Sequence, residues 1–551
     1  MQARGLYLIF LFLPVSALWG QQPILYHRGT VNAASLAPFG LPNAPIARGS
    51  IFTVFGENLG PVTPQTVSAF PLTPTFAGVS LAVTQNGTTT QAFPIFVSPS
   101  QINAIMPSSV AAGLATLRLT YLTGKSNAVT IQIANAAPGV FAVSSGGYGP
   151  GIVQNFISGS NQPINASTVP ATPGQTVTIW GTGLGAVTFP DNVAPTAGNV
   201  STPVTLTIGG QPAAVQYSGR TPCCSGVDQI VATVPNNAPL GCWVPVTVNA
   251  GGVVSNTTTM AIAAAGATSC SDPGNPLSAL VRTAGTQAYI DVERMDTIDN
   301  VNASPAIPKT MDKLYTRFYT RPNSPYNFDP YMSYPPPGSC LVHQTSNDAV
   351  LAKSLRGVLP ASASLSPQPQ QTYNNGTQAI TFSPNGSFFS STMAASANST
   401  PVAMNPLGAN ASITIDPGGA NQLQLPLSLE PPLAWSRPNA IIVVPRNAPL
   451  ALTFTPGDPA APTGIVLYSY TANNNSTVEV QCLAPPGANS FTISADTLAN
   501  FPATYGLIDG SYANLFIGTL GLNSAKSFTN GLAASGMVLT SNWIAQSVVL
   551  Q

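Results

Sequence analysis

The 551-residue chain carries 17 basic and 17 acidic residues, so 6% of its residues are charged, against roughly 25% in an average soluble protein. The zero net charge and the lack of a basic run argue against a nucleic-acid-binding surface. The 48 glycines and 54 prolines separate short runs rich in Val, Ile, Thr and aromatic residues, which is typical of strands joined by tight turns. The length is too great for one core, so we predict an all-β protein of several domains.

The N-terminus has the pattern of an export signal. One cation, Arg4, precedes an apolar run from Leu6 to Leu13, followed by small residues. The run is shorter than the ~20 residues that a membrane span needs. We expect cleavage after Gly20, with Ala17 as the alternative, and a secreted or cell-surface bacterial protein without an integral membrane segment after cleavage.

An internal repeat follows. When the chain is shifted by 125 residues, "GQTVTIWGTGLGA" (174–186) falls on "GSIFTVFGENLGP" (49–61). Further on, "QIVATVP" (229–235) falls on "QINAIMP" (101–107) at an offset of 128, as loop insertions between strands would produce. The matched runs alternate apolar and polar residues, so we predict two similar β-sandwiches.

The glycines of "VTIWGTGLGA" could suggest a dinucleotide-binding loop, but the repeat argues against it. In the first copy Asn58 stands where the second has Gly183, and no helical period follows Gly185. Gly and Asn are the residues that best tolerate a left-handed backbone, so this position is predicted to be a positive-φ turn after a strand.

Several phrases of this half carry a resemblance to a known group. "VNAASLAPFGLPNAPIARGSIFTVFGENLGP", "FVSPSQINAIMP" and "SNAVTIQIANAAPGVF" resemble the tandem immunoglobulin-like repeats of secreted acidobacterial proteins of the Solibacter type, which are similar to IPT/TIG domains. The resemblance covers about residues 25–265. It implies immunoglobulin-like sandwiches and an extracellular role, and it implies no enzymatic activity.

The composition changes after residue 265, where charged and aromatic residues become frequent. The later part of the chain again has the pattern of strands and hairpin turns. We predict tandem immunoglobulin-like β-sandwiches followed by a further β-sandwich region. The predicted boundaries are 1–20 for the signal, 21–142 and 143–265 for the two immunoglobulin-like sandwiches, 266–365 for a charged, Tyr- and Pro-rich connecting region, and 366–551 for the C-terminal sandwich region.

Charged and aromatic residues concentrate between 282 and 334, and three interpretations compete for them. In the first, "TMDKLYTRFYT" forms a short helix that, with the following loop, buries its aromatics on a sandwich face. In the second, the segment binds a carbohydrate or another ligand. The candidate ligand-binding residues are Tyr315, Arg317, Tyr319, Tyr326, Tyr331 and Tyr334.

The third interpretation is a metal or catalytic carboxylate site in "YIDVERMDTIDN". The spacing lacks the pattern of an EF-hand loop. The candidate ligands, if the side chains converge, are Asp291, Glu293, Asp296 and Asp299.

Export makes disulfides the expected state of the six cysteines. Two bridges are expected among Cys223, Cys224, Cys242 and Cys270, and one between Cys340 and Cys482. Because adjacent cysteines more often take separate partners, we expect Cys223 and Cys224 to pair apart, one of them with Cys242.

The sequence contains no catalytic motif, and its only two histidines, His27 and His343, leave few options for a His-based general base. We therefore predict a secreted, non-catalytic protein for cell-surface adhesion or extracellular ligand binding, without a cofactor. Its expected partner is a glycan or a cell-envelope component. A carboxylate-dependent glycoside hydrolase or a purely structural envelope spacer is the alternative.

Overall fold

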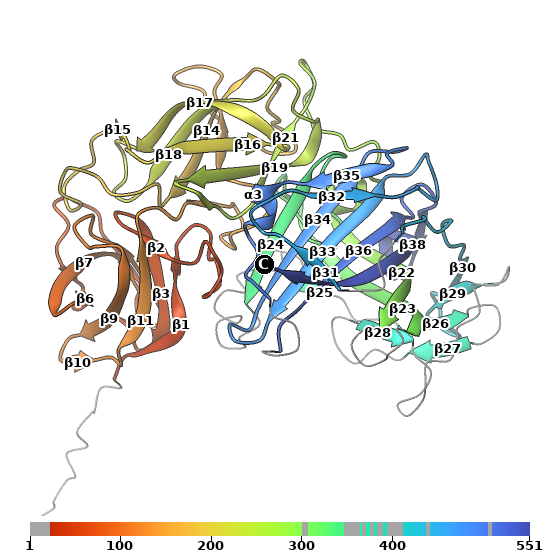
Figure 1. The fold of residues 1–551 in the computed structure, drawn as a ribbon, viewed down its shortest axis with the longest axis horizontal. Coiled ribbons are helices and arrows are strands. Elements are labelled where there is room, and N and C mark those ends of the chain that lie inside the picture. The colour runs from red at the N-terminus through yellow and green to blue at the C-terminus, as the bar shows by residue number, and fades with distance from the viewer. Residues whose placement is uncertain are drawn as a thin grey trace, which may run out of the picture.

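The computed structural model describes residues 22–299, 307–346, 411–436, 441–504 and 510–551, together with short strands between 364 and 393; of 297–299, 307–317 and the strands between 364 and 393 it describes the backbone alone. The predicted export signal lies outside these residues. Within them, strands dominate and the helices are α1 (Leu277–Arg282) and α3 (Ala495–Leu498). The all-β prediction is confirmed, and the strands gather into three bodies (Figure 1).

The first body is a β-sandwich closed around one apolar core. Its strands alternate exposed and buried residues, as along Gly113–Tyr121. In spatial order the strands are β1 (Ile24–Asn32), β3 (Ile51–Glu57), β8 (Gln101–Ile105), β7 (Thr88–Val97), β6 (Val79–Gln85), β9 (Gly113–Tyr121), β11 (Val129–Ala134) and β2 (Ile46–Ala47), with β4 (Gln65–Thr66), β5 (Thr75–Phe76) and β10 (Gly124–Lys125) at the margins.

The second body repeats this arrangement. Its strands β14 and β16 begin 125 residues after β3 and β6, so the shift read from the sequence is the shift between equivalent strands. The strands are β12 (Gly139–Val140), β14 (Thr176–Thr182), β18 (Asp228–Thr233), β17 (Gln211–Arg220), β16 (Val204–Ile208), β19 (Gly241–Ala250) and β20 (Val253–Val254), with β13 (Val153–Asn155), β15 (Gly198–Asn199) and β21 (Thr258–Ile262) off this path.

The repeated turn after β3 and β14 has the conformation that the sequence predicted. Asn58 has φ +56° and Gly183 has φ +102°. A Cβ atom added to Gly183 would lie 2.1 Å from the carbonyl oxygen of Ala137, so the second copy needs glycine for space as well as for conformation.

The third body is built on one large curved sheet. Its strand order is β24 (Cys340–Ser346), β34 (Ser476–Ala484), β33 (Thr463–Thr471), β36 (Tyr512–Leu520), β38 (Ala533–Leu550), β22 (Gly285–Asp299), β23 (Ile307–Arg321) and β25 (Ser364–Leu365), with β28 (Phe389–Met393), β31 (Ile442–Val444) and β37 (Lys526–Asn530) attached. Two small sheets complete it: β27 (Ala379–Phe382), β26 (Gln371–Asn374), β29 (Ser412–Ile415) and β30 (Leu423–Pro426) form one, and β32 (Leu450–Thr453) and β35 (Ser490–Ile493) the other.

The segment predicted as a connecting region belongs to this sheet. β22 and β23 form a hairpin, and β22 also pairs in parallel with β38, so the C-terminal region begins well before residue 366. The short helix predicted around "TMDKLYTRFYT" is also wrong, because this stretch lies in strand β23. Its interstrand partners, β22 and β28, supply the hydrogen bonds that a helix would have made internally.

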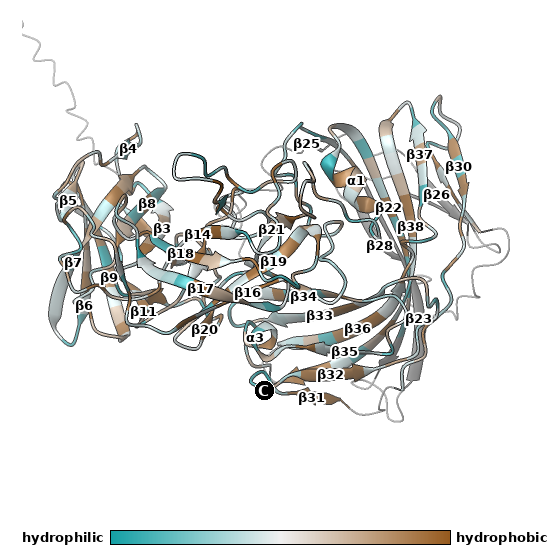
Figure 2. Cartoon of the chain, turned by 90° about the horizontal axis from the view of Figure 1, so that it is seen from above, coloured by the Kyte–Doolittle hydropathy of each residue, from teal (hydrophilic) through white to brown (hydrophobic). Residues whose placement is uncertain are grey.

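The large sheet separates distinct apolar cores. One face packs against β32, β35 and α3, and the other, which we call the inner face, packs against α1 and part of the second body. Figure 2 shows the sheet curving, with α1 on its inner side. Leu277, Leu280 and Val281 of α1 contribute to the inner core, together with Trp243 of the second body.

Each of the three bodies contacts both others, so the two sandwiches do not form an extended linear array. Between the first and third bodies, the Asn43 amide donates to Gln344 Oε1 at 3.0 Å, and Leu41 joins a core of the third body. Between the first and second, the backbone N–H of Ile51 donates to Thr182 Oγ1 at 2.9 Å. Trp243 links the second and third.

A buried ion pair reinforces the contact between the two sandwiches. Arg220 and Asp228, which are 2% and 1% exposed, form a salt bridge across β17 and β18. The Arg220 guanidinium also donates to the carbonyl oxygen of Gly49 in the first body and, at 3.1 Å, to that of Gly185. Asp228 accepts the backbone N–H of Leu184 at 2.8 Å, so both charges are hydrogen-bonded inside the protein.

All six cysteines are bonded, and both bridges of the first group pair differently from the prediction. Cys340 pairs with Cys482 as predicted, whereas Cys242 pairs with Cys270. Cys223 and Cys224 bond to each other, so the expectation of separate partners and of a bridge to Cys242 is wrong.

Cys223 and Cys224 do not bond Cys242 because their loop and Cys242 lie at different junctions between the bodies. The loop of Cys223 and Cys224 contacts the first body, where Gly226 lies against Ile51. Cys242 lies instead at the junction with the third body, where its backbone N–H donates to Asp272.

Candidate ligand-binding face

The inner face of the large sheet carries acidic and aromatic side chains from β34, β33, β36 and β22. Side chains of directly paired residues in neighbouring strands point to the same side. The strand register places Glu479 of β34 opposite Tyr468 of β33, and Tyr468 opposite Asn514 of β36. At the other end of the sheet, Ser541 of β38 is paired with Glu293 of β22.

Asp291 is the most deeply buried acid on this face. It is 6% exposed, and its Oδ2 accepts a hydrogen bond from the Tyr289 hydroxyl at 2.9 Å, while Oδ1 has no partner. Burial raises the pKa of Asp291 to about 7, against the lowering effect of hydrogen bonds from Tyr289 and Ser541. The Ser541 hydroxyl oxygen in turn accepts the indole N–H of Trp543 at 3.0 Å.

Tyr334 connects the two acidic ends of the face electrostatically. Burial raises the pKa of the Tyr334 phenol well above its usual value, and the charges of Asp291, Glu293 and Glu479 raise it further. The phenol is therefore within electrostatic range of carboxylates from β22 and from β34. Burial likewise raises the pKa of Glu479, whose Oε1 accepts the Gln481 amide at 2.6 Å.

A strip of tyrosines continues from Glu479 toward solvent. The rings of Tyr468 and Tyr512 are 6.0 Å apart, and those of Tyr470 and Tyr512 are 5.5 Å apart. Tyr512 is 44% exposed, and the other two are half-buried. Glu479 and Asn514 flank Tyr468 in adjacent strands. We call these five residues the tyrosine strip.

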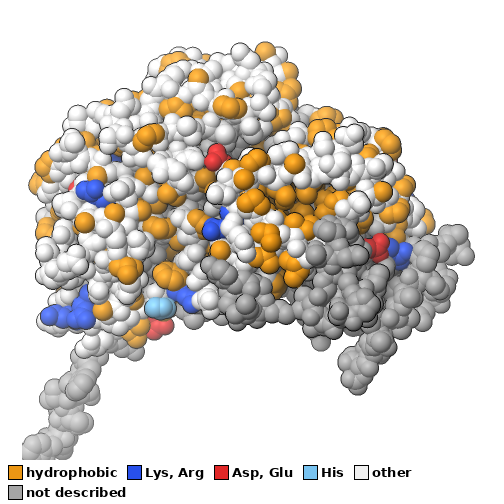
Figure 3. Space-filling model, viewed as in Figure 1, with side chains coloured by type: hydrophobic (Ala, Val, Ile, Leu, Met, Phe, Trp, Pro, Cys, Tyr) orange, Lys and Arg blue, Asp and Glu red, His pale blue; other side chains and the backbone are white. Residues whose placement is uncertain are grey.

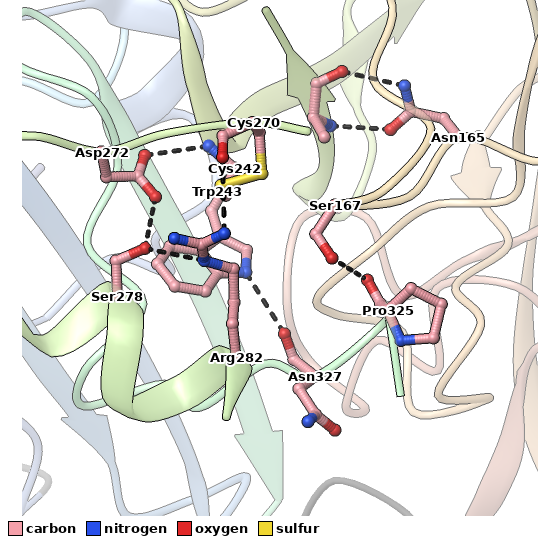
Figure 4. Close-up of a disulfide and its surroundings, with 11 residues drawn as sticks. Asn165, Ser167, Cys242, Trp243, Cys270, Asp272, Ser278, Arg282, Pro325 and Asn327 are labelled. Carbon is pink, nitrogen blue, oxygen red and sulfur yellow. Dashed lines mark hydrogen bonds between the residues drawn. A yellow bond between two sulfur atoms is a disulfide. The ribbon is translucent and has the colours of Figure 1, made fainter. Parts of the chain in front are cut away.

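The loop that carries Tyr334 is held against the second body near the Cys242–Cys270 disulfide (Figure 4). The Trp243 indole donates to the carbonyl oxygen of Asn327 at 3.4 Å, and the Ser167 hydroxyl to that of Pro325 at 2.9 Å. Figure 4 also shows Asp272 bridging the disulfide and α1: it accepts the Cys242 N–H at 2.9 Å and the Ser278 hydroxyl at 2.6 Å.

An ion pair fixes the same loop to the sheet. Arg321 and Asp329, both nearly fully buried, are 3.1 Å apart. The Arg321 guanidinium lies over the Tyr319 ring at 4.7 Å from its centroid and donates to Gln287 Oε1 at 3.2 Å. The Tyr331 backbone N–H donates to Asp329 Oδ1 at 3.1 Å. The loop is therefore positioned by the protein's own contacts.

The six residues predicted to bind a ligand differ in how far the structure exposes them to solvent. Tyr319 is 1% exposed and its hydroxyl contacts Met332 Sδ at 3.7 Å, so it belongs to the core and not to a ligand surface. Tyr331 is 52% exposed, while Tyr326 and Tyr334 are half-buried. The side chains of Tyr315 and Arg317 lie outside the described residues.

The four predicted metal ligands do not share one face. Side chains alternate along a strand, so Asp291 and Glu293 point to the inner face and Asp296 to the opposite one. The Asp299 side chain lies outside the described residues. Within the part of the chain that the structure describes, no group of three or more His, Cys, Asp or Glu side chains is placed to hold a metal ion.

The tyrosine strip was not among the residues predicted from the sequence. The signal was present in part as a two-residue period: Tyr468 and Tyr470 alternate with buried residues in "GIVLYSYT", and Glu479 lies between buried residues in "STVEVQCLA". The pairing of the first of these segments with the strand of Tyr512, about 40 residues further on, required the sheet itself.

Comparisons with known proteins give no family for this chain. No family model matches it, and no curated protein is similar to it. Among solved structures, a tetra-tandem repeat from the extending region of a large adhesion protein is 10% identical over 91% of this chain and 96% of that chain, with a TM-score of 0.13.

A Bacteroides ovatus mixed-linkage glucan utilization locus protein, SGBP-B, in complex with a heptasaccharide, is 16% identical over 49% of this chain and 63% of that one, with a TM-score of 0.19. The plexin A4 extracellular region is 13% identical over 42% of this chain, with a TM-score of 0.15, and this chain spans 17% of its length. Likenesses this weak indicate no function for this chain. The structure itself contains two repeated immunoglobulin-like sandwiches and three disulfides.

Disulfides of this kind are typical of oxidising, extracytoplasmic compartments. Among the described helices, none has the length and apolar character needed to cross a bilayer.

Proposed function

We propose that this protein is an extracytoplasmic, non-catalytic glycan-binding or adhesion protein whose ligand surface is the tyrosine strip, with Tyr334 and Gln481 beside it. In this proposal the two sandwiches are repeats of the kind found in secreted acidobacterial proteins, and they support the third body. The ligand is a polysaccharide or another glycan of the cell envelope or the environment.

The observation that carries the proposal is the cluster of Tyr468, Tyr470 and Tyr512, with ring centroids 5.5 and 6.0 Å apart along the Tyr512 contacts. Ring faces of partly exposed tyrosines offer apolar surface for the C–H face of a sugar. The Tyr470 hydroxyl donates to Asn475 Oδ1 at 3.3 Å and Tyr468 is hydrogen-bonded to Tyr512, so the protein holds these rings in position. Glu479 and Asn514 on either side supply an acceptor and an amide for sugar hydroxyls.

The scarcity of charge supports a neutral ligand. Only 6% of the residues of the chain are charged, and the described part of the face in Figure 3 carries few charged side chains. Neutral polar surfaces of this kind bind without counterion release, so we expect glycan retention to change little with salt.

The experiment is retention of the full mature protein on a panel of insoluble polysaccharides and on bacterial cell envelopes. Tyr512→Ala and Tyr470→Ala should each weaken retention about 3- to 10-fold, if each ring contributes about 1 kcal/mol. Tyr331→Ala, which removes an exposed tyrosine of the loop, is the matched control and should retain binding. Unchanged retention in both strip variants, or no retention of the wild type anywhere, would contradict the proposal.

A second candidate, carboxylate-dependent glycoside hydrolysis, has one specific observation in its favour. Asp291, with its pKa at about 7 and Glu293 on the same face, has the protonation behaviour of a general acid. Its 6% exposure argues against contact with a substrate. Hydrolysis predicts turnover of a bound glycan that is lost in Asp291→Asn and Glu293→Gln, whereas binding alone predicts no turnover by the wild type.

A further inference from the structure

A cavity of about 200 Å³ lies in the first body at its junction with the third, far in sequence from the tyrosine strip. Its walls are mostly apolar and include Phe39, Leu41, Ile46 and Ile131. Leu41 also packs into a core of the third body, so the wall that it forms is fixed by the contact between the two bodies. A comparable engineered cavity of roughly 150 Å³ accommodates benzene.

The polar residues that line this cavity are His27, Arg28, Thr30, Thr130 and Gln132, and two of them, Arg28 and Thr30, carry unpaired groups that can donate. Arg28 lines it, donates from its guanidinium to the carbonyl oxygen of Asn473 in the third body, and lies over the Phe39 ring at 5.9 Å from its centroid. The Nε of Arg28 and the hydroxyl of Thr30, which also lines the cavity, are buried and have no hydrogen-bond partner. A buried donor without a partner costs roughly 1–3 kcal/mol, more when charged, so both groups favour a ligand that accepts hydrogen bonds.

The charge of Arg28 is also uncompensated locally. Among the described residues that line the cavity none is acidic, and the ion pairs that the structure describes do not include Arg28. A carboxylate is the compact anion that matches a guanidinium geometrically. A sugar would bring many hydroxyls against apolar walls, where they would lose their hydrogen bonds to water.

We propose that this cavity binds a small monocarboxylate with a compact apolar or aromatic group, about the size of phenylacetate. The apolar group fills the space between Phe39, Leu41 and Ile131, and the carboxylate accepts hydrogen bonds from Arg28 and Thr30. The site shares no residue with the tyrosine strip, although Asn473, which Arg28 contacts, lies in the turn between β33 and β34, close in the chain to Tyr470. Because Arg28 already contacts Asn473 across the junction, an occupied cavity also strengthens the contact between the first and third bodies.

The test is isothermal titration of the full mature protein with phenylacetate, in a buffer free of phosphate and carboxylates. The uncharged analogue 2-phenylacetamide has nearly the same shape and should bind at least about tenfold more weakly, since a charge-assisted hydrogen bond contributes roughly 1.5–3 kcal/mol. Arg28→Gln should weaken phenylacetate binding by a similar factor, about tenfold or more.

Arg118→Gln is the matched control, because Arg118 is an exposed arginine of the same body on β9, outside the cavity. It should leave the affinity for phenylacetate unchanged. Equal binding of the acid and the amide, equal binding to Arg28→Gln and the wild type, or no binding of phenylacetate at millimolar concentration would overturn the proposal. If Arg28→Gln fails to fold, the comparison of acid and amide on the wild type still decides.

Discussion

The two buried titrating groups of the inner face should give this protein opposing pH dependences that single substitutions can separate. Burial raises the pKa of Asp291 to about 7, whereas burial lowers the pKa of His343 to about 4, with a smaller opposing effect of the Asp329 charge. His343 is half-buried, packs against Tyr148 and Phe328 with ring centroids 6.2 and 5.8 Å away, and has its Nε2 buried without a hydrogen-bond partner.

The signs follow from proton binding in the folded and unfolded chains. Between pH 4 and 7 the folded protein holds a proton on Asp291 that the unfolded chain releases, so this group's stabilising contribution is complete below about pH 4 and is lost as the pH rises through 7. His343 acts in reverse: the unfolded chain binds its proton near pH 6.5 and the folded protein only near pH 4, so stability is lost as the pH falls through this window.

The magnitudes follow from about 1.4 kcal/mol per pKa unit. Asp291→Asn should therefore gain stability relative to the wild type by up to about 4 kcal/mol between pH 4 and pH 7. His343→Gln should instead lose up to about 3 kcal/mol relative to the wild type over the same rise in pH. Urea denaturation followed by tryptophan fluorescence at several pH values measures both differences, and Trp543, which is bonded to Ser541, reports on this region.

Burial also raises the pKa values of other acids in this protein. Their contributions to the pH dependence of stability are the same in variant and wild type, so they cancel in the difference between the two. If the Asp291→Asn difference varies by less than about 1 kcal/mol across this range, the carboxyl titrates as it does in water and our account of its surroundings is wrong. A His343→Gln difference that moves in the same direction as that of Asp291→Asn would refute the sign assigned to the histidine.

Two further predictions concern the sandwiches. Arg220→Ala should destabilise the protein by about 3–5 kcal/mol in urea, because it leaves Asp228 charged and buried, whereas Arg118→Ala at an exposed site should cost less than about 0.5 kcal/mol. Gly183→Ala should lower the unfolding free energy by about 1–3 kcal/mol, because the position has φ +102° and no room for a Cβ, whereas Asn58→Gly at the equivalent turn should be nearly neutral by the same measurement. Equal losses at the two turns would contradict the steric argument.

The two sandwiches could be predicted because the sequence patterns that define them are local and occur in both copies. The alternation along each strand and the exchange of Asn58 for Gly183 at one turn are readable in any window of the sequence, and the 125-residue shift places them in register. The pairing of Cys223 with Cys224 could not be predicted in this way, because it depends on which body the loop contacts.

The fold of the third body was harder to predict from the sequence because the strand pairings that define it join residues far apart in the chain. β22 pairs with β38, some 250 residues later, and this pairing gives the charged segment a strand partner that local charge density does not suggest. The two-residue period of "YIDVERMD" favours a strand, whereas its density of charged side chains favours an exposed or ligand-binding segment, and the structure follows the period. The sequence singled out Tyr334 as a candidate ligand residue, but its proximity to the acids of β22 and the clustering of the tyrosines of β33 and β36 depend on the assembled sheet.

The pairwise contacts among the three bodies have a consequence for the history of the duplication. In an open array every copy presents the same free end to the next, so copies can be gained or lost without disturbing the remainder. Here the first copy contacts Gln344 of the third body through Asn43, whereas the second contacts the 325–327 loop through Ser167 of the equivalent loop and also through Trp243, so each copy meets a different part of the third body. An inserted third copy would have no equivalent place to dock. The two copies are thus no longer interchangeable modules, and the number of repeats is fixed by the geometry of the assembled chain.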